Sequence, residues 1–338
     1  MKKLKLAVTV GLLGVASSAF SAGVIINSAG TVALGINDLG HLNTSVGNVA
    51  ANAGTTGLAF KFPAGVPLGG TFQDATSPGC DCEGWGVSVN GTTSGFANAS
   101  VGTGGLALGS FATDGLEATS IVSLSALPGL SVTHHFTESV NAPGALFRTE
   151  VTITNTTGAD VTDLKYVRVM DWDIPPTTFN EEVTIKGTAT TSFLEESHDN
   201  GFNSADPLAA SSPLNPATLD VDFTDDGPAD HGAYFRFNFG DLLADMSQTF
   251  EIFYGATGTE AAALAAVAAE GIELFSFGQS SAGDNEITGS PATYIFGFKG
   301  VGGVPVIPPT GVPAPASLAL VGLGLIGLSL RRRKTAAL

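Results

Sequence analysis

The chain has 338 residues with 44 glycines, 43% hydrophobic and 13% charged residues, a composition that excludes a disordered chain and favours short strands with tight turns. Its 31 acidic residues outnumber its 14 lysines and arginines, which gives a net charge of −17. Nucleic acid is excluded as a partner, because a phosphate backbone would be repelled by this charge.

The first 22 residues predict a secretory signal peptide. A start with three lysines is followed by an apolar run at residues 6–15 and by the small-residue stretch SSAFSA, which ends at a predicted cleavage point after Ala22. The apolar run is shorter than the roughly 20 residues that span a bilayer, so removal is favoured over a permanent anchor. We therefore expect an exported body, and seven of the 14 basic residues lie outside it, in the signal and the tail.

The apolar pattern predicts strands through most of the body. Two short strands are expected within Val24–Asn43. The segment Ala145–Ile174 alternates apolar and polar residues on either side of a turn at Asn155–Asp160, which predicts an antiparallel hairpin. A second hairpin is expected within His231–Ala256.

Only one segment predicts a helix, the alanine-rich Thr259–Gly271, with Thr259 as its N-cap and Gly271 at its end. The stretches IELFSFG and TYIFGFKG after it predict two further strands. The fold class is therefore all-β, a large antiparallel β-sandwich with one short late helix. We expect this body at residues 23–300 and an extended Pro/Gly linker at residues 301–311.

The two cysteines, Cys80 and Cys82, lie in the turn-forming stretch SPGCDCEGWG. Export places them in an oxidising compartment, where a C-x-C pair can close a small disulfide. A zinc site needs further ligands, and the chain has no other cysteine. A local disulfide or two free thiols is therefore favoured over a metal.

Two groups of aspartates are candidates for calcium. Asp171 and Asp173 in MDWDIPP share one face of a strand, where paired carboxylates could bind calcium, act as general acid and base on a glycan, or simply end the strand. The acidic run LDVDFTDDGPADHG is compatible with a calcium loop or with a solvated loop. Its aspartates do not have the spacing of an EF-hand. Its candidate ligands are Asp220, Asp222, Asp225 and Asp226.

No catalytic motif is evident: the chain has no G-x-S-x-G, H-E-x-x-H or P-loop. We therefore expect a non-catalytic protein without a cofactor, apart from the calcium hypothesis. The alternative is a carbohydrate-binding or carbohydrate-active module that acts on exopolysaccharide, with Asp171, Asp173 and an exposed Trp85 as its first candidate residues.

The tail at residues 312–338 combines a short proline motif, an uncharged apolar span and an arginine cluster. Residues 312–330 are just long enough for a transmembrane helix, and the basic residues after it would stay cytoplasmic. This order resembles the PEP-CTERM sorting signal of exported bacterial proteins, although Ala314 stands where the family has glutamate. The resemblance rests on Val312, Pro313, Pro315, Arg331, Arg332 and Arg333.

The resemblance implies that a membrane-embedded exosortase recognises and removes the tail. It also implies release or transfer to the cell surface of a bacterium that often makes exopolysaccharide, so surface polysaccharide is an expected partner. The alternative is a plain single-pass anchor that keeps the body facing outward at the inner membrane.

Overall fold

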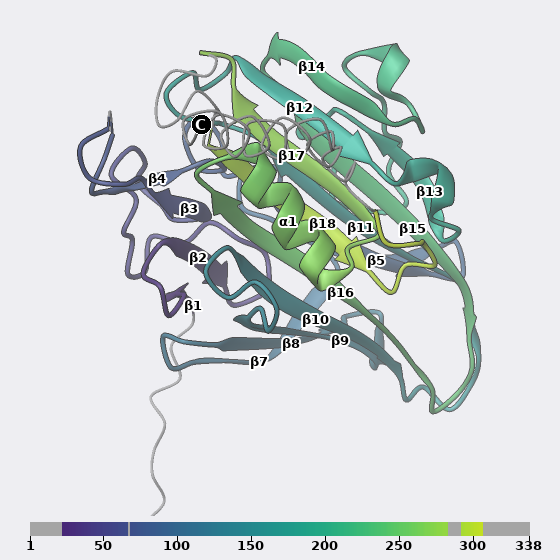
Figure 1. Ribbon diagram of the computed structural model, residues 1–338. Coiled ribbons are helices and arrows are strands. Elements are labelled where there is room, and N and C mark those ends of the chain that lie inside the picture. The colour runs from purple at the N-terminus through teal and green to yellow at the C-terminus, as the bar shows by residue number, and fades with distance from the viewer. Residues whose placement is uncertain (1–21, 67, 283–291, 307–338) are drawn as a thin grey trace, which may run out of the picture.

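The computed structural model describes residues 22–66, 68–282 and 292–306, and it is all-β as predicted. Its strands form three sheets in which neighbouring strands run antiparallel (Figure 1). The predicted signal peptide up to residue 21 and the predicted transmembrane tail lie outside the described residues. Within the described ranges, no helix is long and apolar enough to cross a membrane.

The nine-stranded sheet has the order β14-β12-β17-β18-β16-β10-β9-β8-β7. In chain order its members are β7 (Leu106–Thr113), β8 (Ala118–Leu124), β9 (Leu127–Glu138), β10 (Leu146–Asn155), β12 (Glu181–Lys186), β14 (Phe223–Ala229), β16 (Ser247–Thr257), β17 (Leu274–Ser280) and β18 (Thr293–Lys299).

The five-stranded sheet has the order β13-β15-β11-β5-β6, and the four-stranded sheet the order β1-β2-β3-β4. The five-stranded sheet contains β5 (Gly84–Val89), β6 (Thr93–Asn98), β11 (Val161–Asp171), β13 (Leu194–His198) and β15 (Gly232–Leu242). The four-stranded sheet contains β1 (Ala22–Ile26), β2 (Val32–Asn37), β3 (Leu58–Lys61) and β4 (Phe72–Asp74). Two short 3-10 helices lie at Thr188–Thr190 and Pro216–Thr218.

One hydrophobic core joins the inner faces of all three sheets. Phe147, Val151 and Ile153 alternate along β10 with side chains that are only half-buried, so the predicted period of two is confirmed. Along β11 the main core takes Tyr166 and Met170, while Val167 and Val169 face the opposite side of the sheet.

The one α-helix of the described residues, α1 (Glu260–Glu270), begins and ends as predicted. The Thr259 hydroxyl accepts a hydrogen bond from the backbone N–H of Ala262, and Gly271 adopts a left-handed conformation with φ of 68°. The helix lies across the outer face of the nine-stranded sheet (Figure 1), where Val267 packs in a second hydrophobic cluster with Phe253.

Both predicted hairpins are wrong, although all four of their strands exist. β10 pairs with β9 and β16, whereas β11 pairs with β5 and β15. The turn after β10 therefore carries the chain from the nine-stranded to the five-stranded sheet, and the turn between β15 and β16 carries it back. Alternation shows that one face of a strand is buried, but it does not identify the partner strand.

Asn155 ties these two crossings together at the end of β10. Its side-chain amide donates to the carbonyl oxygens of Ala159 at 2.8 Å, Leu242 at 3.0 Å and Leu243 at 3.2 Å. Its own backbone exchanges hydrogen bonds with the second crossing, through Asp245 and Met246. The side chain is fully buried, and its bond to the Leu242 carbonyl is buried as well, so that carbonyl depends on Asn155 for a donor.

We expect Asn155→Ala to lower the free energy of unfolding by about 3 kcal/mol, because the buried Leu242 carbonyl and two partly buried carbonyls lose their donor. Asn155→Asp should be at least as damaging, because it places carboxylate oxygens against the same carbonyls. Urea unfolding measures both, with the exposed Asn180 in the same Asn→Ala change as the control. An Asn155→Ala variant as stable as this control would contradict the assignment.

A buried ion pair connects all three sheets inside the core. The Arg168 guanidinium on β11 binds the Glu83 carboxylate just before β5, and neither side chain has any exposure. Glu83 also accepts hydrogen bonds from the backbone N–H of Leu42 at 2.7 Å and from the Tyr254 hydroxyl at 3.3 Å. Since Leu42 follows β2 and Tyr254 lies in β16, one carboxylate contacts elements of each sheet.

Candidate metal centre

The end of β11 places two carboxyl groups in the interior, on the side of the sheet away from the main core. Asp171 is the last residue of the strand and is 1% exposed, and Asp173 follows with no exposure. Trp172 between them points into the main core. The Asp173 backbone N–H donates to the Ala75 carbonyl at 2.8 Å, which fixes this segment against the end of the four-stranded sheet.

Strand pairing brings two further acidic residues to the same place. In the ladders, Asp171 pairs with Gly232 on β15 and Glu181 pairs with Ala229 on β14, so Asp230 lies beside both pairs. One oxygen from each of Asp171, Asp173 and Asp230 lies within 4.8 Å of the others. The sequence did not predict Glu181 as a member, nor that Asp230 of the acidic run lies beside Asp171, because both placements depend on these long-range pairings.

Several carboxylate oxygens in this cluster have no hydrogen-bond partner. They are Oδ1 of Asp171, both Oδ atoms of Asp173 and Oε2 of Glu181, and all are buried. The other Glu181 oxygen is used, since it accepts from the backbone N–H groups of Ile174 at 3.1 Å and Phe179 at 2.6 Å. In the described part of the chain, no lysine or arginine forms an ion pair with any of the four carboxyl groups.

The electrostatics of the cluster reflect burial and like charge. Burial, followed by the charges of Asp173, Asp230 and Glu181, raises the pKa of Asp171 to about 10. Burial and then Glu181 and Asp230 raise the pKa of Asp173 to about 8. Burial also raises the pKa of Glu181 to about 8. These buried groups cannot all carry a negative charge unless a cation neutralises it. Without a cation, some of them hold a proton.

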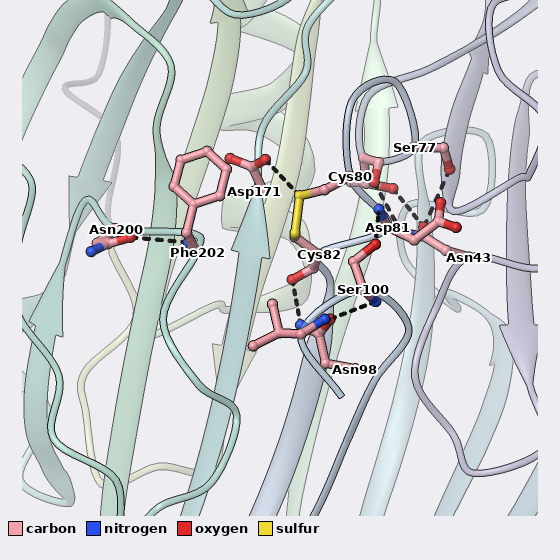
Figure 2. The surroundings of a disulfide bond; sticks show 12 residues. Asn43, Ser77, Cys80, Asp81, Cys82, Asn98, Ser100, Asp171, Asn200 and Phe202 are labelled. Carbon is pink, nitrogen blue, oxygen red and sulfur yellow. Dashed lines mark hydrogen bonds between the residues drawn. A yellow bond between two sulfur atoms is a disulfide. The ribbon is translucent and has the colours of Figure 1, made fainter. Parts of the chain in front are cut away.

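A disulfide joins Cys80 and Cys82 beside the cluster. Figure 2 shows the Asp171 side chain directed at this bridge, with its Oδ2 atom 3.3 Å from Sγ of Cys80. The bridge is held in turn by Asn98, whose amide donates to the Cys82 carbonyl at 2.7 Å. Because the sulfurs are bonded to each other, they are not available as thiolate ligands.

A second group, formed by Asp199, Asp226 and His231, lines a hollow of about 300 Å³ next to the first. Here hydrogen bonds already satisfy the carboxylates. Asp199 accepts from the backbone N–H of Leu214 at 2.8 Å, and Asp226 accepts from the Asn215 amide at 3.0 Å. Burial favours the neutral acid, but bonds from His231 and from neighbouring donors outweigh it and lower the pKa of Asp199. Hydrogen bonds therefore stabilise the carboxylates of this group without a cation.

The aspartates of the acidic run proposed as a calcium loop make hydrogen bonds at separate places and do not share one site. Asp220 accepts a hydrogen bond from the Ser197 backbone N–H at 2.8 Å, and Asp222 from that of Thr188 at 2.9 Å. Asp225 accepts from the Thr184 hydroxyl at 3.2 Å. Among the described residues, Asp226 is the only one of the four in a group close enough to hold an ion.

Trp85 is not exposed, contrary to expectation. It is fully buried on β5, and its indole N–H donates to the Leu39 carbonyl at 2.8 Å. Asp171 and Asp173 are likewise inaccessible to a polymer chain. The arrangement is thus suited to binding a small ion and is closed to a glycan at these residues.

Comparison with known families matches residues 311–334 to the family model of the PEP-CTERM protein-sorting motif. The chain carries a PEP-CTERM protein-sorting motif. The match contains the six tail residues on which the resemblance rested, and these lie outside the described residues. The PEP-CTERM motif implies export, processing by an exosortase and a surface or membrane-associated location. Neither a curated protein nor a solved structure matches the chain.

Proposed function

We propose that this protein is a non-catalytic cell-surface or extracellular-matrix protein, from which an exosortase removes the PEP-CTERM tail. The observation that carries the proposal is the sorting motif at residues 311–334, which follows a large all-β body. The parts would act in chain order: a signal peptide at residues 1–22, the body at 23–300, a linker at 301–311, and a tail at 312–338 whose helix crosses the membrane until it is cut.

The burial of the candidate residues supports a role without catalysis. A general acid and base for glycan hydrolysis must contact the glycosidic bond, whereas Asp171 and Asp173 are 1% and 0% exposed. Trp85, the aromatic candidate for stacking on a sugar, has no exposure either. The carbohydrate-active alternative therefore loses the residues proposed for it, and surface polysaccharide enters the proposal only as a partner in the matrix.

The C-terminal peptide of the mature protein tests the proposal. We expect mass spectrometry of surface and medium fractions from the producing cells to find a chain that ends near Pro315. A version without residues 311–334 should still be exported but should not reach the surface fraction. Peptides that continue through Leu330 in the mature protein would indicate a permanent anchor instead. Turnover of a polysaccharide by the purified protein would contradict the non-catalytic role.

A further inference from the structure

We propose that Asp171, Asp173 and Asp230 form a binding site for one calcium ion, with Glu181 beside it. The site would join the end of β11 to the connection between β14 and β15. The proposal goes beyond the sorting of the protein and does not depend on it, because it rests on the body alone.

The first observation is geometric. One oxygen from each of the three aspartates lies within 4.8 Å of the other two. Two ligands of one calcium ion, each at about 2.4 Å from the metal, are at most about 4.8 Å apart, so a single ion can contact all three groups. Glu181 lies outside this group of three, but its Oε2 atom is buried without a hydrogen-bond partner and its charge acts on Asp171 and Asp173, so it adds negative charge beside the ion.

The second observation is that buried oxygens are left without partners. Asp173 is fully buried with neither of its carboxylate oxygens bonded, and Oε2 of fully buried Glu181 is also unbonded. A buried polar atom without a partner is costly, and native proteins usually satisfy it with a hydrogen bond, a water or an ion. The Asp199 group next to it, where amide and hydroxyl donors fill the same role, shows what a satisfied cluster in this fold looks like.

The donor atoms select the class of ion. All three ligands are carboxylates, which suit hard cations such as calcium and magnesium, and neither a thiolate nor an imidazole is in the set. Calcium accepts irregular sets of carboxylates, whereas magnesium requires near-octahedral geometry and keeps several waters. Asp230 is exposed while Asp171 and Asp173 are buried, so the ion enters from the side of Asp230.

A bound calcium ion would link the three sheets at this end of the sandwich. Asp171 ends β11 of the five-stranded sheet and Asp230 directly follows β14 of the nine-stranded sheet, while the Asp173 backbone is bonded to Ala75 beyond the four-stranded sheet. One ion would hold all three sheets in place through ligands that otherwise repel one another. The body would then be most stable where calcium is abundant, as it is outside the cell.

The experiment compares the purified protein after treatment with EGTA and after addition of about 1 mM CaCl2, a concentration that fills typical extracellular sites. We expect calcium to raise the melting temperature by about 5 °C or more, since binding only the folded state stabilises it. Titration calorimetry should show about one ion per chain. Absence of both signals would overturn the proposal, and an equal shift with the same concentration of MgCl2 would overturn the assignment to calcium.

Two variants and one control locate the ion. Asp230→Asn alters an exposed side chain, so it should fold normally and bind calcium at least tenfold more weakly. Asp173→Asn should abolish the calcium-dependent shift without lowering the melting temperature in EGTA, because it removes a repulsive charge. Asp241→Asn removes the same charge at another exposed site and should retain wild-type affinity. Equal loss in all three variants would indicate general charge screening and overturn the proposal.

Discussion

Glu83→Ala is expected to lower the free energy of unfolding by about 3–5 kcal/mol, because it leaves the buried Arg168 guanidinium without its carboxylate. Burial alone would lower the pKa of Arg168. The charges of Glu83 and of two neighbouring tyrosine hydroxyls outweigh that effect and raise the pKa above its ordinary value. Without Glu83 that support is lost, but an arginine is not deprotonated in a protein, so the variant keeps a buried charge. Its remaining partners are the Gly40 carbonyl, at 3.3 Å from two of its nitrogens, and the Tyr166 hydroxyl.

Removing both charges should be much less harmful than removing one. The double variant with Glu83→Met and Arg168→Met replaces the pair by apolar side chains of similar length, and such replacements are often neutral or stabilising. Denaturant unfolding of the single and double variants measures the difference. Glu195→Ala serves as the control, because Glu195 pairs with Lys165 at a partly exposed site and should contribute about 1 kcal/mol or less. A double variant less stable than Glu83→Ala would contradict this account.

The position of the ion pair suggests why the core retains two buried charges although removing them from water is unfavourable. Each sheet presents an apolar inner face, and apolar contacts alone would tolerate sliding of one sheet over another. Glu83 accepts hydrogen bonds from elements of the four-stranded and nine-stranded sheets and binds Arg168 within its own sheet. These directional bonds fix the relative position of the three sheets, which we regard as their main contribution.

The sequence was informative wherever one segment carried its own signal. The α1 helix could be predicted because Thr259 and Gly271 cap it locally, and β10 because its alternation reports a buried face. The partners of β10 and β11 could not be predicted, since a connection of five residues, 156–160, can turn within one sheet or cross to another. The full membership of the candidate site could not be predicted for the same reason. Asp230 and Glu181 come close to Asp171 only through the pairing of β11 with β15 and of β12 with β14.

Trp172→Ala is expected to lower the free energy of unfolding by about 3–5 kcal/mol, the usual cost of a large aromatic side chain removed from a core. The indole lies against the backbone of β17, where a Cβ atom on Gly278 would stand 2.7 Å from Cδ2 of the ring. Its N–H donates to the Ser276 hydroxyl at 3.1 Å. The tryptophan thus fixes the segment between the two aspartates to the nine-stranded sheet.

The same residue should control the geometry of the acidic cluster, because Asp171 and Asp173 flank it directly. We expect Trp172→Ala to weaken calcium binding as well as stability, measured by calorimetry at a temperature where the variant is folded. Trp172→Phe keeps an aromatic ring but loses the hydrogen bond to Ser276, so its stability loss should be about 1–2 kcal/mol with affinity near that of the unchanged protein. Gly278→Val provides a matched test, since it displaces the indole without removing it. Unchanged calcium affinity in both Trp172→Ala and Gly278→Val would mean that the carboxylates are positioned by the strand pairings and the disulfide turn alone.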